Sequence, residues 1–196
     1  MSIRHLDALF SPASVAVFGA SERIGSVGGT VWRNLLGHGA SGYRGRLYPV
    51  NPKHSQLSGV TTYRSAEALP EVPDLAVICT PAHTVAPLIA ALGARGTRAA
   101  IVVTAGLNKA QKQSMLDAAR VHTLRILGPN CIGMLVPHLG LNASFAHIGA
   151  LPGDLAFVSQ SGALVPAMLD WAGSRGIGCS HFVSLGERAD VDFGDM

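Results

Sequence analysis

The sequence predicts an α/β protein in which helices pack on a doubly wound, mostly parallel sheet. Of its 196 residues, 48% are apolar and 14% are charged, which is typical of a globular chain with buried strands. Short apolar runs bounded by glycine or proline alternate with segments of helical periodicity. The runs predicted as buried strands are SVAVFGA (14–20), RLYPV (46–50), LAVIC (75–79), AAIVVTA (99–105) and LRILG (124–128).

Helical spacing is found between these strands. Residues 27–39 are expected to form a helix that turns Trp32 and its apolar neighbours inward. The apolar residues between Val85 and Leu92 recur at helical spacing, and a more polar helix over residues 108–122 is expected to face solvent. Strands separated by helices in this order imply parallel pairing with crossover connections.

The pattern starts again farther along the chain. Residues 155–160 predict a strand, residues 162–176 a helix and residues 179–186 a second strand. The residues expected to face inward on that helix are Leu164, Val165, Met168, Leu169 and Ala172.

A connection near residues 137–153 contains glycine, proline and histidine and is expected to hold a domain boundary. We therefore predict a first domain of residues 1–140 and a second that begins with residues 141–196. One βαβ unit is too small to fold alone, so the second domain is expected to be incomplete.

Several protein classes are disfavoured. No apolar run approaches the length of a membrane span, and the N-terminus has Asp7 inside its only apolar patch, so we expect neither a signal peptide nor a membrane partner. A cytoplasmic location follows. Cys79, Cys131 and Cys179 are odd in number and lack CxxC spacing, which favours reduced core thiols over metal ligands.

Charge is distributed unevenly. Residues 1–125 contain 13 Lys or Arg against 6 Asp or Glu, whereas residues 126–196 contain 2 against 6. The first part is therefore expected to bind an anionic ligand. Nucleic acid is disfavoured as a partner because the basic residues are scattered and no basic run is interleaved with aromatics.

The stretch VFGASERIGSVG places Gly19, Gly25 and Gly28 between a strand and a helix, as in loops that bind phosphates. A dinucleotide-binding GxGxxG is disfavoured because Ser21 takes the place of the second glycine and no acidic residue closes the second strand. A short-chain dehydrogenase would need a tyrosine with a lysine four residues on, and a P-loop would need GK[ST]; neither occurs. The loop thus indicates a nucleotide-like ligand of another kind, with a structural tight turn as the alternative.

The second strand ends in Asn51-Pro52-Lys53. The rigid turn before Lys53 would place its ammonium group for a phosphate-bearing cofactor. A solvated surface lysine fits the spacing equally well.

The stretch FVSQSGAL (157–164) predicts a strand, a turn and the start of a helix. A hydrolase nucleophile elbow would need GxSxG, but Ser159 and Ala163 flank Ser161, and His181 is the only later histidine. The two serine hydroxyls and Gly162 instead suit an anion at a helix start.

Taken together, SVAVFGAS, LYPVNPK, DLAVICTPA, LRILGPNCIG, LNASFA, FVSQSGAL and ADVDFGDM resemble, in order, segments of the CoA-binding part of NDP-forming acyl-CoA synthetases. That group contains succinyl-CoA synthetase α subunits and ADP-forming acetyl-CoA synthetases. The resemblance implies a Rossmann-like domain that binds CoA or acyl-CoA, followed by the start of a flavodoxin-like domain. It also implies an ATP-grasp domain or β subunit as partner. The same segments also begin proteins fused to a GNAT lysine acetyltransferase.

The resemblance implies two groups of site residues. Those expected to bind CoA are Gly19, Ala20, Ser21, Arg23, Ile24, Gly25, Lys53, Thr80, Pro81, Val103, Thr104, Ala105 and Asn130. Those expected to face a phosphorylated histidine are Ser159, Gln160, Ser161, Gly162 and Ala163. Ala105 departs from succinyl-CoA synthetases, which have a glutamate there. No Ser-His-Thr-Gly-like context occurs, so the histidine is expected farther along and no catalytic residue is predicted in residues 1–196.

The implied parent reaction is that of an ADP-forming acyl-CoA ligase, which interconverts acyl-CoA, ADP and phosphate with carboxylate, CoA and ATP. Two alternatives stay open on the sequence. The chain could be the acetyl-CoA-sensing module of a lysine acetyltransferase, or a standalone CoA-binding protein without catalysis.

Overall fold

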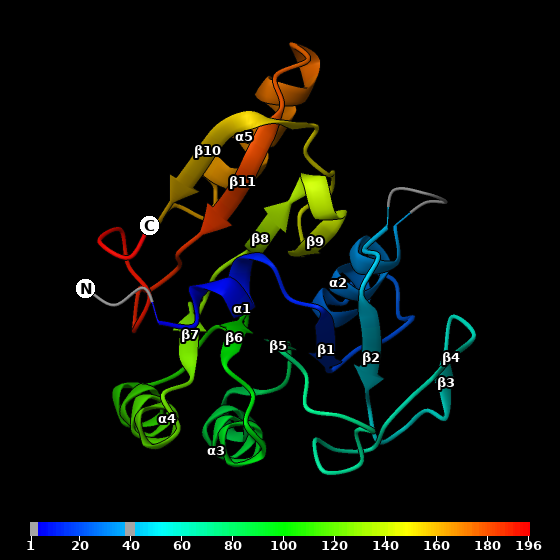
Figure 1. Ribbon diagram of the computed structural model, residues 1–196, viewed down its shortest axis with the longest axis vertical. Coiled ribbons are helices and arrows are strands. Elements are labelled where there is room, and N and C mark those ends of the chain that lie inside the picture. The colour runs from blue at the N-terminus through cyan, green and yellow to red at the C-terminus, as the bar shows by residue number, and fades with distance from the viewer. Residues whose placement is uncertain (1–3, 38–41) are drawn as a thin grey trace.

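A computed structural model describes residues 4–37 and 42–196. Two sheets of five and four strands dominate it (Figure 1). The elements are α1 (Leu6–Phe10), β1 (Ser14–Phe18), α2 (Val27–Leu36), β2 (Arg46–Val50), β3 (Gln56–Leu57), β4 (Val60–Thr61), β5 (Leu75–Ile78), η2 (Ala82–Thr84), α3 (Val85–Arg95), β6 (Ala99–Val102), α4 (Lys109–Val121), β7 (Arg125–Leu127), β8 (Gly133–Val136), η3 (Pro137–Leu139), β9 (Leu141–Ser144), β10 (Pro152–Ser159), α5 (Leu164–Ser174) and β11 (Cys179–Ser184).

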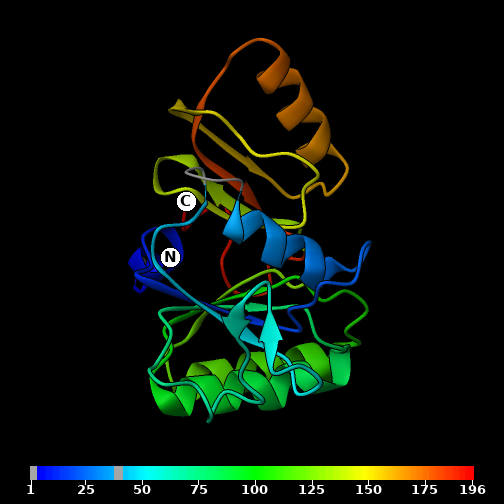
Figure 2. The same cartoon turned by 90° about the vertical axis from the view of Figure 1, so that its right-hand side faces the viewer.

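The first sheet has the strand order β2-β1-β5-β6-β7, and all of its pairings are parallel. Strands β1, β5 and β6 are buried along their whole length, as expected for a sheet covered on both faces. Helices α3 and α4 pack on one face, and α2 lies on the other (Figure 2). The predicted α/β class is therefore confirmed. Although α4 is polar, its Met115 and Ala119 are buried.

The second sheet has the strand order β10-β11-β8-β9. Strands β10 and β11 are parallel, whereas β8 pairs antiparallel with both β11 and β9. Helix α5 covers one face of this sheet with Val165 and Leu169, which join Phe182 of β11 in a separate apolar cluster. The predicted inward position of Leu164 is wrong: this first residue of α5 is 46% exposed, because the helix packs through its following turns.

The stretch predicted as a connection contains ordered structure. Strand β9 lies within residues 137–153, and β8 immediately precedes it. The chain therefore passes from the first sheet to the second between β7 and β8, before the boundary expected from the sequence. The division at residue 140 stays a prediction.

The two sheets share one apolar core. Val17 of β1 and Trp32 of α2 belong to the same buried cluster as Met134 of β8 and Val183 of β11. Helix α2 therefore lies between the two sheets, as Figure 2 shows. Burial of all these side chains makes the first and second sheets one packed body.

The C-terminal segment returns to the first sheet. The backbone N–H of Val191 donates to the carbonyl of Ile126 at 3.1 Å, beside β7. The buried Arg125 guanidinium bonds Asp190 and Asp195, at 3.0 Å each. These contacts fix residues 189–195 against the edge of the first sheet.

Within the described residues, no helix combines the length and hydropathy needed to cross a bilayer. The three cysteines form no disulfide. Burial raises the pKa of the Cys79 and Cys131 thiols to about 12, so both are protonated at neutral pH.

Candidate functional site

A cavity of about 580 Å³ lies where the carboxyl ends of β5 and β6 meet the second sheet. We call it the strand-end pocket. Its lining residues are Val27, Cys79, Thr80, Pro81, Val103, Thr104, Ala105, Asn130, Cys131, Ile132, Phe145 and Gly162. Ligands of open α/β sheets bind at this edge, so the position agrees with a binding site.

The pocket brings several predicted residues together. Thr80, Pro81, Val103, Thr104, Ala105 and Asn130 from the first group all line it, and Gly162 from the second group joins them. The glycine loop, Lys53 and the other members of the serine turn do not line this cavity. Their role in binding stays a prediction.

Five lining residues were missed by the sequence analysis as site residues. Cys79 and Cys131 were assigned to the core only, and Val27 only to the helix. Ile132 and Phe145 come from the stretch around β8 and β9, which was not predicted as structured. The one sequence signal for Ile132 and Phe145 is that they lie in LRILGPNCIG and LNASFA, two of the segments that resemble the acyl-CoA synthetases.

The glycine loop approaches neighbouring backbone closely. Gly19 has φ +86°, and a Cβ there would lie 3.0 Å from the carbonyl oxygen of Cys79. A Cβ on Gly28 would overlap the carbonyl oxygen of Gly19. Both positions therefore require glycine, and α2 begins directly against the end of β1. The first turn of α2 therefore adjoins the glycine loop, the arrangement found in phosphate sites at helix N-termini.

Polar contacts hold the loop from outside. The Asn51 side-chain amide donates to the carbonyl of Ala20 at 2.8 Å. Glu22 accepts a hydrogen bond from the Ser58 backbone N–H at 2.6 Å, which ties the loop to the hairpin of β3 and β4. Ser26 caps α2 by accepting from Gly29 N–H at 3.2 Å. The loop conformation is thus fixed by residues on three separate elements.

Lys53 follows Asn51 in a turn stabilised by a 3.0 Å bond from its own backbone N–H to the Asn51 side chain. Its side chain is exposed, and in the described part of the chain it forms no ion pair. Asn51 therefore touches the glycine loop and positions the backbone of Lys53 at once. The ammonium group is free to meet a phosphate near the loop.

Threonine hydroxyls order the ends of β5 and β6. Thr104 donates to the carbonyl of Thr80 at 2.7 Å, and Thr84 donates to the Thr80 hydroxyl at 2.7 Å. These bonds hold one wall of the pocket in place. Ala105 is exposed and offers no polar side chain.

Asn130 lies at the mouth of the pocket with φ +55°. Its backbone N–H donates to Thr104 at 3.0 Å, and its side-chain amide donates to Glu187 at 3.3 Å. Glu187 also pairs with Lys112 at 2.8 Å. No sequence pattern indicates Glu187 or Lys112 as neighbours of Asn130, because Glu187 lies 57 residues from Asn130 and Lys112 reaches it only through Glu187.

The serine turn joins β10 to α5. The Ser159 hydroxyl is buried and accepts from the Ser161 backbone N–H at 3.0 Å, while Ser161 accepts from Leu164 N–H at 3.4 Å. Helix α5 has no side-chain cap at Ala163, but its first turn offers few donors to an anion, because the Leu164 N–H is bonded to Ser161 and Pro166 has no N–H. His181 instead packs its ring against Phe10, which gives the serine hydrolase alternative no base.

Comparison with known proteins identifies both parts of the chain. Residues 13–137 match the family described as CoA binding domain, and residues 152–196 match the succinyl-CoA ligase like flavodoxin domain. The chain is 37% identical to the α subunit of ADP-forming acetate-CoA ligase I from Pyrococcus furiosus, over 97% of this chain and 43% of that protein. It is 36% identical to ADP-forming acetate-CoA ligase I from Archaeoglobus fulgidus, over 97% of this chain and 28% of that protein.

A solved structure agrees with these relatives. The dinucleotide-forming acetyl-coenzyme A synthetase 1 of Ca. Korarchaeum cryptofilum, in complex with phosphate and ADP, matches with a TM-score of 0.91 and 36% identity. The match covers 97% of this chain and 41% of that one. The chain thus spans less than half the length of these relatives. They agree with the resemblance predicted from the sequence, and none supports the acetyltransferase alternative.

Proposed function

Because the chain belongs to the family of CoA-binding domains that begin ADP-forming acyl-CoA synthetases, we propose that it binds CoA or acyl-CoA across the glycine loop and the strand-end pocket. The observation that carries this proposal is the meeting of Thr80, Ala105 and Asn130 with Gly162 in one cavity. Thr80, Ala105 and Asn130 lie in the segment that matches the CoA binding domain, and Gly162 lies in the segment that matches the flavodoxin domain. The pocket would therefore join the edge proposed to bind the cofactor to the turn expected to face a phosphoryl group.

The proposed pose follows the charges and the available donors. The diphosphate would lie at residues 19–25 against the first turn of α2, and Lys53 would meet a CoA phosphate. The pantetheine arm would pass the ends of β5 and β6, where Thr104 fixes the wall. Its thiol end would then reach Asn130, close to Gly162.

We further propose that the chain contributes this half-site to an ADP-forming acyl-CoA ligase. The partner would be an ATP-grasp domain or β subunit, which holds the nucleotide. The first turn of α5 and the turn at Ser159 and Ser161 would donate hydrogen bonds to a phosphorylated histidine supplied from outside the described residues. A cytoplasmic location is in line with three cysteines that form no disulfide.

Calorimetric titration of the chain with CoA, dephospho-CoA and NADH tests the cofactor. We expect CoA to bind most tightly, because the loop and Lys53 favour phosphates and no acidic residue ends β2 to hold the adenosine ribose of NADH. Tighter binding of NADH than of CoA would contradict the proposal.

Lys53→Ala tests the cation within the same titration. We expect CoA to bind more weakly, whereas a loss smaller than about 0.5 kcal/mol would show that Lys53 is only a solvated surface residue. Arg98→Ala is the matched control. Arg98 is exposed immediately before β6, at the opposite edge of the sheet, and its removal is expected to leave CoA affinity unchanged.

A further inference from the structure

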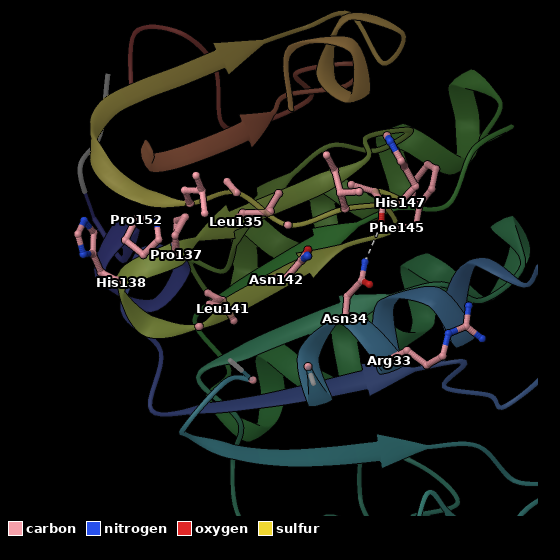
Figure 3. A pocket seen from close by; sticks show the side chains of 18 of the residues that line it. Arg33, Asn34, Leu135, Pro137, His138, Leu141, Asn142, Phe145, His147 and Pro152 are labelled. Carbon is pink, nitrogen blue, oxygen red and sulfur yellow. Dashed lines mark hydrogen bonds between the residues drawn. The ribbon is translucent and has the colours of Figure 1, made fainter. Parts of the chain in front are cut away.

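A second and larger cavity lies on the other half of α2. Its volume is about 1000 Å³, and its walls are the last turns of α2, strands β8 and β9, and the segment that leads into β10. Figure 3 shows Asn34 directed from α2 towards the segment that carries Phe145 and His147. We call this space the α2 groove. On α2 its lining begins at Thr30, whereas Val27 at the start of the helix lines the strand-end pocket.

The walls of the α2 groove are fixed by hydrogen bonds. The Asn34 side-chain amide donates to the carbonyl of Ser144 at 2.8 Å and to that of Ala146 at 2.9 Å. These bonds anchor the chain on both sides of Phe145 to α2. The floor is formed by the buried Leu135 and Leu141. A pre-formed apolar floor of this kind, in a cavity of this size, is typical of small-molecule sites.

The ionisable side chains among the described residues that line the groove are all basic. Arg33, Arg44, His138 and His147 line it, whereas no described lining residue is an aspartate or glutamate. His138 and His147 are engaged, by the carbonyl of Gly153 at 3.1 Å and by a carboxylate of α5 at 2.9 Å.

Arg33 and Arg44 therefore supply the positive charge of the groove. Arg33 donates only to the Thr30 hydroxyl, at 3.2 Å, among the hydrogen bonds of the described residues. Within the same part of the chain, neither Arg33 nor Arg44 forms an ion pair. Two arginines that line a cavity with an apolar floor match a ligand that has an anionic head and an apolar body.

We propose that the α2 groove binds a small organic anion with an apolar body, such as a medium-chain carboxylate. The head group is held by Arg33 and Arg44, and the body lies on Leu135, Leu141 and Phe145. The site is separate from the strand-end pocket, although Phe145 lines both cavities. The inference does not depend on the proposed ligase function.

Octanoate, kept below its micellar concentration, is the probe. We expect saturable binding with one site in calorimetry, and weaker binding of acetate, which lacks the apolar body, and of 1-octanol, which lacks the charge. Arg33→Gln and Arg44→Gln should each weaken octanoate about tenfold, because a charge-assisted hydrogen bond is lost. Arg98→Gln, an exposed arginine elsewhere, should change the affinity less than about twofold.

The titration is then repeated with saturating CoA. Retained octanoate binding supports a separate site. The proposal is overturned if octanoate does not saturate, if both arginine variants bind it like the unmodified chain, if acetate or 1-octanol binds equally well, or if CoA displaces it completely. Failure of CoA to bind would contradict the proposed function but would leave the octanoate result standing.

Discussion

Gly28→Ala tests the close contact on which the glycine loop depends. Gly28 is buried in the first turn of α2. A Cβ at this position would overlap the carbonyl oxygen of Gly19, lie 2.8 Å from its carbonyl carbon and lie 3.5 Å from Cβ of Cys79. The first two atoms are backbone, so no side chain can rotate away. Either α2 or the loop must move.

The magnitude follows from two opposing effects. In an unhindered helix, replacing glycine by alanine stabilises a protein by about 0.5–1 kcal/mol. Overpacking a tight site costs about 1–3 kcal/mol, and an overlap with backbone lies at the upper end. We therefore expect a net loss of about 1–2 kcal/mol in the free energy of unfolding. Because Gly19 moves with the phosphate-facing loop, CoA affinity should fall at least about tenfold.

Urea unfolding and CoA calorimetry measure the two effects on the same samples. Gly173→Ala is the matched control, because Gly173 lies in α5 and a Cβ there would meet no atom within 4 Å. That variant should be as stable as the unmodified chain or slightly more so, with unchanged CoA affinity. If Gly28→Ala unfolds at the original urea concentration and binds CoA normally, the argument for a sterically required glycine is refuted.

Three further perturbations test other contacts. Arg125→Met removes the guanidinium that bonds Asp190 and Asp195 and should lower the free energy of unfolding by about 3 kcal/mol; a loss below about 1 kcal/mol in urea would show that the C-terminal contact contributes little. Glu22→Gln weakens the bond that ties the glycine loop to Ser58, so CoA affinity should fall about twofold to threefold in calorimetry, and an unchanged affinity would contradict a positioning role. Burial raises the pKa of Cys79 and Cys131 to about 12, whereas unfolded thiols ionise near about 8.5. The folded state therefore retains protons that the unfolded state loses, and the urea midpoint should fall as pH rises from about 8.5 towards 12; a rising midpoint would contradict this.

The first sheet could be predicted from the sequence because its central strands are buried on both faces. Such strands are continuous apolar runs, as in β1 and β5, and need no knowledge of their partners. Some predicted apolar runs extend past the ends of the strands in the structure. AAIVVTA includes Thr104, yet β6 stops at Val102, because the residues beyond it turn into the pocket wall.

Strands β8 and β9 could not be predicted in the same way. Each is only four residues long, so neither the apolar run of β8 (GMLV) nor the alternation of β9 (LNAS) is long enough to indicate a strand by itself. They are strands because β8 pairs with β11, which lies more than 40 residues later in the chain. Tertiary pairing of this kind leaves little local signal.

The candidate site shows the same difference between residues that could be predicted and residues that could not. Thr80 and Asn130 follow predicted strands and Thr104 lies near the end of one. The carboxyl ends of parallel strands meet at one edge, so their meeting could be predicted. Phe145 and Glu187 reach the site from the second sheet and the segment after it. Their positions depend on how the two sheets pack, which the sequence patterns do not specify.

The strand-end pocket is therefore a property of the contact between the two sheets. The first sheet supplies Thr80 and Ala105, whereas Phe145 and Gly162 arrive with the second. The shared core around Trp32 and the C-terminal contact of Arg125 hold these walls together, so their stability and the shape of the pocket are linked. A variant that weakens the ion pairs of Arg125 without unfolding the chain should consequently lower the affinity for CoA, even though Arg125 does not line the pocket. Unchanged CoA affinity in such a variant would mean that the first sheet alone forms the site.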